Sequence, residues 1–380
     1  MIEAERATPA GDEADLWDVA VIGAGPAGSM AARECARRGL RVALLDKAAF
    51  PRVKVCGCCV SRGALSVLEN VGLAHLVREL GGVPLREWHV AAQGRVAALT
   101  DLNLGVSLSR SALDAALVSA AVAAGVTFLP NTAALIGDCG ERTRSVQVRT
   151  GQGPGNLAAR VVVAAAGLNA RAEDPAHRHG NRLGAAAIAD SAPEVLGPGK
   201  VYMACAKSGY VGAVRLEDGR LNLAASLAPQ LIRELGGLGP AAAAVLEDAG
   251  IAIPRCDALG WQGTTYLTYR PRRVADDRLF LVGDAAGYVE PFTGEGIAWA
   301  LGTGAAVAEF AAQGCNHWGP GLAAKWTRRH SALIGWNQTR CRMVARLLRS
   351  GLALSSGVWC VDRAPRLSRR LVRRFGRSTA

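Results

Sequence analysis

The stretch WDVAVIGAGPAGSMAARECARRGLRVALLD, residues 17–46, decides the fold of this chain. It begins with a short apolar run at Val19–Ile22, turns through the glycines of 23–28, and continues with helical spacing of apolar residues over 27–38. A second apolar run follows and ends in Asp46. The order of strand, tight turn, helix and buried strand predicts the first unit of an α/β fold with a parallel sheet.

The turn in this stretch has the spacing Gly-x-Gly-x-x-Gly between a strand and a helix, which is typical of a dinucleotide site. Gly23 permits the tight turn, Gly25 lets a pyrophosphate approach the backbone, and Gly28 lets the helix pack closely on the sheet. Asp46 follows Gly28 by 18 residues, where a carboxylate accepts hydrogen bonds from a ribose with a free 2′-hydroxyl. This favours FAD or NAD over NADP. The binding residues predicted here are Gly23, Gly25, Ala27, Gly28, Asp46 and Lys47.

The segment FLVGDAAGYVEPFTGEGIAWAL, residues 280–301, decides between FAD and NAD. Together with the glycine turn it resembles the flavoproteins that include geranylgeranyl reductases, p-hydroxybenzoate hydroxylase-type monooxygenases and flavin-dependent halogenases. The resemblance covers most of residues 16–312 and implies FAD as cofactor, held between a Gly-Asp pair and a Pro-x-x-Gly-x-Gly turn whose helix stabilises anionic reduced flavin. The residues it implies are Gly283 and Asp284 at the ribityl chain, the turn from Pro291 with Gly294, Gly296 and Ile297, and Arg110 near the phosphates.

The rest of the pattern predicts a Rossmann-like FAD-binding domain that a second domain interrupts. Residues 159–167 read as a buried strand of the parallel central sheet, whereas 171–277 alternate and turn at 217–219, as in an antiparallel sheet. We expect a discontinuous FAD-binding domain (1–85, 105–170 and 278–322), a substrate-binding antiparallel-sheet domain (86–104 and 171–277) and a basic C-terminal helical segment (323–380).

The stretch KVCGCCVS places three thiols, Cys56, Cys58 and Cys59, close together. FPRVKVCG resembles the loop of geranylgeranyl reductases that passes close to the flavin, and Cys56 matches the family cysteine. This implies a catalytic role for Cys56 in orienting substrate, tuning the flavin or donating a proton, with its pKa set by Lys54 and Arg52. A zinc site and a disulfide relay are alternatives that lack their usual companion motifs, so we expect no metal. Loop packing is the alternative for Cys58 and Cys59.

Several motifs of the superfamily are altered or missing. After a buried strand the monooxygenases carry Asp-Gly and then an arginine, whereas this chain has Ala166, Gly167 and Arg171. Because that motif is tied to nicotinamide use, the electron donor, NAD(P)H or a reduced carrier, stays open. The Tyr-x-Trp-x-Phe-Pro stretch of prenyl reductases and the Trp-x-Trp-x-Ile-Pro motif of halogenases are absent. The aromatic candidates for the cavity wall, with a core position as the alternative, are Tyr202, Tyr210 and Trp261.

Positive charge is concentrated in the C-terminal segment. From Ala323 onward 14 Lys or Arg residues stand against one acid, Asp362, in a chain whose net charge is +12. The Leu, Val and Phe residues between the arginines favour an amphipathic helix on an anionic membrane surface over a nucleic-acid partner. A solvated terminal helix is the alternative. The acidic N-terminus lacks a secretory signal and the ten cysteines are scattered, so we expect a cytoplasmic protein, with peripheral contact to the inner membrane surface.

These features predict an FAD-dependent oxidoreductase that acts on a lipophilic or aromatic small molecule. The leading hypothesis is reduction of an activated C=C bond of a lipophilic substrate by hydride transfer from reduced flavin. One alternative is a monooxygenase that hydroxylates an aromatic or polyketide-like substrate through a C4a-hydroperoxyflavin. Another is a non-catalytic scaffold that binds membranes or nucleic acid. The substrate and the oligomeric state cannot be read from the sequence.

Overall fold

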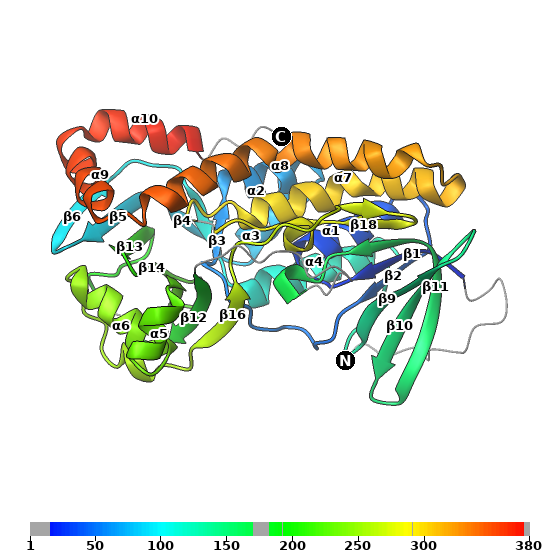
Figure 1. Ribbon diagram of the computed structural model, residues 1–380, viewed down its shortest axis with the longest axis horizontal. Coiled ribbons are helices and arrows are strands. Elements are labelled where there is room, and N and C mark those ends of the chain that lie inside the picture. Colours follow the sequence, from blue (N-terminus) through cyan, green and yellow to red (C-terminus); the bar gives the residue numbers. More distant parts are fainter. Residues whose placement is uncertain (1–15, 170–181, 192, 291, 376–380) are drawn as a thin grey trace.

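The structure is a computed structural model that describes residues 16–169, 182–191, 193–290 and 292–375. Figure 1 shows one sheet toward each end of the molecule, with the long helices α7 (Gly296–Asn316) and α8 (Gly321–Leu347) along one side. Parallel and antiparallel sheets together confirm the mixed α/β fold. The predictions about the N-terminal stretch, Arg171 and Pro291 lie outside the described residues.

The first sheet is the expected parallel one. Its central strand, β1 (Leu16–Ile22), pairs in parallel with β2 (Val42–Leu45) and β11 (Gly153–Ala164). The strand order in the described chain is β17-β18-β11-β1-β2-β8, where the outer strands are β17 (Ala275–Asp276), β18 (Leu279–Leu281) and β8 (Thr127–Leu129). The glycine turn therefore follows the central strand, at the carboxyl edge where α/β proteins bind nucleotides.

A hairpin that the sequence analysis did not anticipate extends this sheet. β11 is longer than the predicted strand at 159–167, because its first half pairs antiparallel with β10 (Arg144–Thr150), which pairs with β9 (Ala133–Cys139). Val146 and Val148 of β10 pack with Ala20 and Leu45 of the parallel strands. The hairpin thus covers the second face of the parallel sheet.

Helices cover the other face. α1 (Pro26–Ala36) lies against α7, and α4 (Arg110–Ala123) lies beside α1. Close approach of α1 and α7 depends on a glycine, because a Cβ at Gly304 would lie 2.3 Å from the carbonyl oxygen of Ala27. Phe280 of β18 and Trp326 of α8 are buried in this core, where their rings pack against each other.

The second sheet faces the first across the molecule. Its order is β16-β12-β15-β14-β13-β5-β6, and all neighbours are antiparallel except β13 and β5. The strands are β16 (Gln262–Tyr266), β12 (Leu183–Ala189), β15 (Leu221–Leu227), β14 (Gly209–Arg215), β13 (Lys200–Ala206), β5 (Glu87–Ala92) and β6 (Arg95–Leu99). One face packs on α6 (Leu238–Asp248) through residues such as Val211, Ala213 and Leu223, so the other face is left for the cavity.

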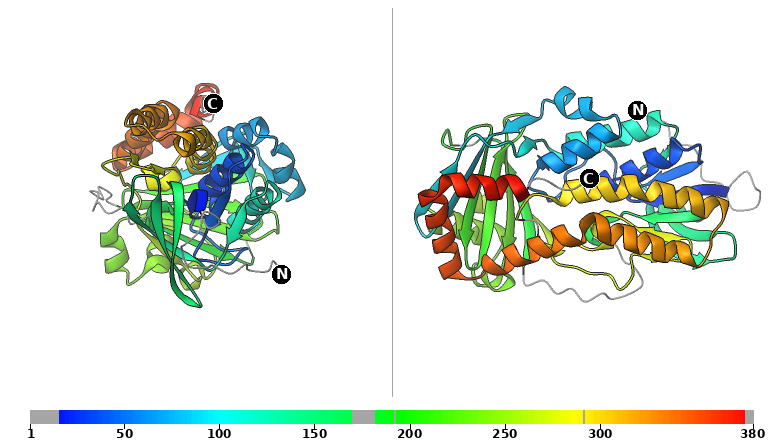
Figure 2. Two further views of the ribbon diagram at one scale, coloured as in Figure 1. Left: turned by 90° about the vertical axis from the view of Figure 1, so that its right-hand side faces the viewer. Right: turned by 90° about the horizontal axis from the view of Figure 1, so that it is seen from above.

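The remaining elements connect these layers. They are the small sheet β3 (Cys59–Ser61), β7 (Gly105–Ser107) and β4 (Val83–Leu85), the helices α2 (Arg62–Asn70), α3 (Ala74–Glu79), α5 (Pro229–Glu234), α9 (Gly351–Arg363) and α10 (Pro365–Phe375), and the short 3-10 turns at Gly167–Asn169, Cys256–Ala258 and Gly283–Ala286. Seen from above in Figure 2, α8 and α10 lie on the same side of the molecule as α7. Within the described residues, no helix combines the length and the apolar character needed to span a bilayer.

Candidate functional site

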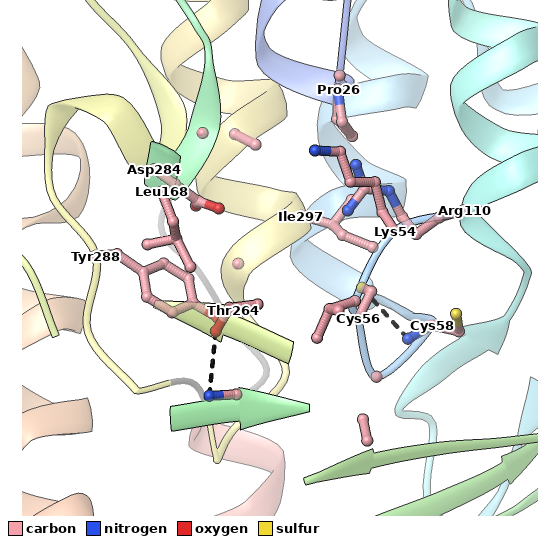
Figure 3. A pocket seen from close by; sticks show the side chains of 18 of the residues that line it. Pro26, Lys54, Cys56, Cys58, Arg110, Leu168, Thr264, Asp284, Tyr288 and Ile297 are labelled. Atoms are coloured by element: carbon pink, nitrogen blue, oxygen red, sulfur yellow. Dashed lines mark hydrogen bonds between the residues drawn. The ribbon is translucent and has the colours of Figure 1, made fainter. Parts of the chain in front are cut away.

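A cavity of about 1010 Å³ lies between the carboxyl edge of the parallel sheet and the open face of the antiparallel sheet. Ligand pockets usually measure about 300–1,000 Å³, so this one has room for a large ligand or for two ligands side by side. Figure 3 shows Pro26, Lys54 and Arg110 on one side of it, and Asp284 and Tyr288 on the other.

Most of the predicted site residues meet at this cavity. Its lining includes Gly23, Gly25, Ala27, Asp46, Lys47, Cys56, Arg110, Asp284, Gly294, Gly296 and Ile297. Gly28 and Gly283 are not among the lining residues and support the two turns from behind. The N–H of Gly283 donates to Thr303 Oγ1 at 3.0 Å, and a Cβ at Gly28 would lie 1.8 Å from the carbonyl oxygen of Gly23. Two turns far apart in the sequence thus face one space.

The first turn forms a cradle that only small residues permit. Gly23 has φ +101°, and a Cβ there would lie 2.6 Å from the carbonyl oxygen of Ala165. A Cβ at Gly25 would instead be in ordinary van der Waals contact with guanidinium nitrogens of Arg52 and Arg110, both at 3.7 Å. The cradle therefore offers backbone at the start of α1 and two cations to an anionic group bound against Gly25.

A buried aspartate positions these two arginines. Asp114, fully buried on α4, accepts hydrogen bonds from Nε and Nη2 of Arg110 at 2.8 Å each, and Nη1 of Arg52 lies 3.3 Å from its Oδ2. Nε of Arg52 is buried without a hydrogen-bond partner in the protein. Because buried donors are normally paired, this donor fits an oxygen of a bound ligand, such as a phosphate oxygen. Sequence reasoning did not single out Asp114, although its (i, i+4) spacing from Arg110 was the available signal.

Asp46 directly follows β2, beside the same cradle. Its Oδ2 accepts a hydrogen bond from the N–H of Ala24 at 2.9 Å, its Oδ1 accepts one from the N–H of Ala48 at 3.0 Å, and Arg52 donates to it at 3.3 Å. These contacts fix the carboxylate against the glycine turn and beside the cationic pair. The position is the one that the sequence analysis assigned to a ribose contact.

The cysteine loop passes along the opposite end of the cradle. Cys56 Sγ accepts a hydrogen bond from the N–H of Cys58 at 3.4 Å, while the Cys56 carbonyl oxygen accepts one from Asn222 Nδ2 at 3.0 Å. A hydrogen bond from the Cys58 thiol and the charge of Arg110 lower the pKa of Cys56 to about 6, against the opposing effect of burial. The same contact raises the pKa of Cys58. Cys58 and Arg110 thus take the place of the Lys54 and Arg52 that we expected to set this pKa.

Two carboxyl groups lie near the start of α7, where the second turn meets the cavity. Burial raises the pKa of Asp284 to about 6, with the charge of Arg110 acting in the opposite direction. Burial also raises the pKa of Glu295 to about 7. Both groups therefore titrate near neutrality while α7 points its N-terminus at the cavity. Tyr288, which lines the cavity close by, has a pKa raised well above its ordinary value by burial and then by Asp284, so its hydroxyl keeps its proton.

The far wall of the cavity is a floor of small apolar residues on the antiparallel sheet. Gly212 of β14 lies opposite Ala224 of β15, and both line the cavity. Gly184, Val201, Met203 and Val214 continue this surface across β12, β13 and β14. Small side chains set the floor back and leave it apolar, which suits a flat or elongated lipophilic molecule.

The aromatic candidates divide between wall and core. Tyr210 lines the cavity, where its ring lies 5.2 Å from the ring of Phe292. Tyr202 and Trp261 pack instead in the hydrophobic core between the sheet and α6. Neighbouring residues of a strand point to opposite faces of the sheet. Which of the two faces meets the cavity, and so the position of Tyr210, is known only from the folded structure. Tyr288 was not predicted, and its place after the Gly-Asp turn was the only signal.

The comparisons with known proteins agree with this geometry. Residues 17–223 match the family described as FAD binding domain. This chain belongs to that family. FAD is therefore its cofactor. The glycine cradle and the unpaired Nε donor of Arg52 fit the diphosphate of this cofactor, and we infer that Asp46 would hold its ribose and Asp284 its ribityl chain.

Two curated proteins resemble most of the chain. Conditioned medium factor receptor 1 of Dictyostelium discoideum is 28% identical over 316 residues, which are 76% of this chain and 62% of that protein. Digeranylgeranylglycerophospholipid reductase 2 of Methanothermobacter thermautotrophicus is 28% identical over 308 residues, or 74% of each chain. The chain thus spans less than two thirds of the first relative.

A solved structure resembles the fold over nearly its whole length. The flavin-dependent brominase Bmp2 aligns with a TM-score of 0.77 over 95% of this chain and 93% of its own, at 18% identity. At that identity the likeness concerns the fold alone.

Proposed function

We propose that this FAD-binding protein is an oxidoreductase that reduces an activated C=C bond of a lipophilic substrate. The observation that carries the proposal is the continuity of one cavity, which joins the glycine cradle to the apolar floor at Gly212 and Ala224. A ligand on that floor would share an enclosed space with the cofactor. Reduced FAD supplies a hydride when bound, and the small side chains of the floor leave room for a long apolar substrate.

One relative supports a lipid substrate. The archaeal protein that matches 74% of this chain is named as the reductase of a digeranylgeranylglycerophospholipid. The floor described above has the apolar character that such a molecule requires. The missing prenyl-reductase stretch in the substrate sheet indicates that the contacts to the lipid differ from those in prenyl reductases.

Two side chains of the cavity, Cys56 and Tyr288, differ in protonation and therefore in the role that we assign to each. Cys56 is mainly a thiolate at neutral pH, because Cys58 and Arg110 lower its pKa. A thiolate orients or polarises a neighbour but is a poor proton donor. Tyr288 keeps its proton and lies in the same cavity. We assign delivery of the second proton to the Tyr288 hydroxyl, because it lines the cavity that the cradle and the floor share and is protonated at neutral pH.

Anaerobic single turnover tests this function. The FAD-loaded protein is photoreduced under argon and mixed with candidate lipids that carry carbonyl-conjugated double bonds, and flavin reoxidation is followed at 450 nm as product mass is measured. The expected result is substrate-dependent reoxidation without oxygen and a product heavier by two hydrogens. The monooxygenase alternative makes the opposite prediction. If turnover requires oxygen and the product carries an atom of ¹⁸O from labelled O₂, the reductase assignment is wrong.

A further inference from the structure

The three C-terminal helices expose large apolar side chains. The exposed fraction is 70% for Trp336, 47% for Met343 and 60% for Leu347, all on α8. On α9, Trp359 is 52% exposed, and on α10, Leu367 is 59% exposed. Where exposed apolar side chains are contiguous, they usually mark an interaction site.

Five exposed residues of α8 lie along one side of the helix. Lys325, Arg329, Trp336, Met343 and Leu347 are spaced by four, seven, seven and four residues, which places them on a single stripe at 3.6 residues per turn. All five are exposed. The stripe begins with two cations and ends with three apolar side chains, so it combines charge and apolar area on one face.

The charge of these helices selects among partners. From Ala323 onward the chain has 14 Lys or Arg residues and one acid. A second copy of the chain would bring this strongly positive surface against itself, and like charges oppose such a contact. A nucleic acid would satisfy the charge but leave the exposed tryptophans and leucines without apolar contacts unless its bases stack on them. An anionic bilayer satisfies both, because its headgroups attract arginine and its acyl boundary takes up Trp and Leu.

Two of these helices also contribute side chains to the wall of the cavity. Val344 of α8 and Val372 of α10 are among the cavity-lining residues. Val344 stands next to the exposed Met343 on the same turn of α8. The wall of the cavity at α8 and α10 is therefore only one helix thick, with a lipid-compatible outer surface.

We propose that α8, α9 and α10 form a docking surface for an anionic lipid bilayer, and that lipophilic substrate reaches the cavity from the bilayer between α8 and α10. The first part stands on the exposed side chains and the charge alone. The second part rests on the function proposed above, because it needs a substrate that dissolves in lipid.

Vesicle co-sedimentation of the full-length, FAD-loaded protein tests the surface. The probes are vesicles of phosphatidylcholine with 30% phosphatidylglycerol and vesicles of pure phosphatidylcholine. We expect binding to the mixed vesicles, weaker binding with rising salt, and at least about tenfold weaker partition to pure phosphatidylcholine. Equal binding to both compositions, or none to either, would overturn the proposal.

Paired variants locate the surface. Trp336→Ser with Leu347→Ser removes apolar area, and Arg366→Glu with Arg370→Glu reverses charge at exposed positions of α10. Each pair should weaken binding to the mixed vesicles about tenfold or more. The matched controls are Val195→Ser with Leu235→Ser, and Arg149→Glu with Arg273→Glu, which change exposed residues outside these helices. Controls that weaken binding equally, or test pairs that bind like wild type, would refute the location.

Sedimentation velocity and oligonucleotide binding, run on the same variants, identify other occupants. A wild-type dimer that the Trp336→Ser, Leu347→Ser pair dissociates, without vesicle binding, would show a self-association surface instead. Salt-sensitive binding of single-stranded DNA without vesicle binding would show a nucleic-acid surface. These assays need no turnover. Vesicle binding without any C=C reduction would therefore refute the proposed function but not the docking surface. C=C reduction without vesicle binding would refute the docking surface but not the proposed function.

Discussion

The two ends of the cavity are built on different physical principles. At the cofactor end, Gly23 and Gly28 are required by the backbone itself, since a Cβ on either would collide with a carbonyl oxygen at 2.6 Å or 1.8 Å. At the substrate end, Gly212 and Ala224 stand opposite each other on neighbouring strands, and their small side chains shape the floor. At the cofactor end the glycines are required by the path of the backbone. At the substrate end the small residues only leave space for a ligand.

This difference explains what each end can tolerate. A backbone constraint is local, so its residues occur at fixed spacing and their replacement disrupts binding of a cofactor common to the family. The floor, by contrast, has its shape because its side chains are small. Any larger residue that the sheet accepts would fill part of that space, and each such change would select a different substrate. The substitutions below test whether the two ends are independent, beginning with the change of largest expected effect.

The largest effect is expected at the cradle. Gly25→Val adds a branched side chain between Arg52 and Arg110, where a Cβ meets both guanidinium groups at an ordinary contact distance of 3.7 Å, so the protein should fold but lose FAD and all activity. Flavin absorbance after gel filtration and circular dichroism measure the two properties. Gly335→Val is the control, because nothing lies within 4 Å of an added Cβ there. If Gly25→Val retains flavin, the assignment of the turn is wrong.

Loss of the proposed proton donor, Tyr288, should have the next largest effect. Tyr288→Phe removes the hydroxyl that burial keeps protonated, and the rate of single turnover should fall about 100-fold, a common loss for a general acid. FAD content should stay the same. Unchanged turnover would assign the proton to another group, and the analogous Tyr210→Phe, at a second tyrosine lining the cavity, serves as the comparison.

A change at the floor should alter substrate use without touching the cofactor. Ala224→Leu fills the space beside Gly212, so kcat/KM for a long lipophilic substrate should fall about 10-fold or more while FAD content stays at the wild-type level. Ala224→Ser keeps the small volume and should behave nearly as wild type. Loss of FAD from the leucine variant would show that the two ends are not independent.

The same contrast explains how far the sequence could predict this molecule. The cofactor end was predictable, because Gly23, Gly28 and Asp46 occupy positions that backbone geometry dictates, and the cavity brings their turn together with Gly294 and Gly296. The floor was not, since alternation shows that a strand has two faces but not which face meets the cofactor, and Tyr202 turned out to be core. Asp114 escaped notice because a buried carboxylate on a helix acquires its role only when Arg52 arrives from another loop.

The cysteine loop connects the two ends of the cavity, and the reactivity of its Cys56 thiol should change gradually with pH. Because the folded state lowers the pKa of Cys56 to about 6, the thiolate forms as pH rises through that value, and alkylation of Cys56 in FAD-free protein should accelerate there. Cys58→Ala removes the donated hydrogen bond and should move the midpoint upward by about one unit. Peptide mapping by mass spectrometry after iodoacetamide pulses measures it. Cys59→Ala is the control, and an equal shift in that variant would contradict the assigned cause.

The smallest effect is expected behind the second turn, where the cofactor end depends on a single hydroxyl. Thr303 Oγ1 is fully buried, accepts the hydrogen bond of the Gly283 N–H at 3.0 Å and donates to the Trp299 carbonyl oxygen at 2.7 Å. Thr303→Val keeps the volume but leaves that N–H unpaired, so the free energy of unfolding should fall by about 1–2 kcal/mol, which urea titration measures. Thr327→Val, at an exposed threonine of α8 whose hydroxyl likewise donates within its helix, should change it much less. Equal losses in both variants would mean that the turn at Gly283 is held by its backbone alone, as the turn at Gly23 is.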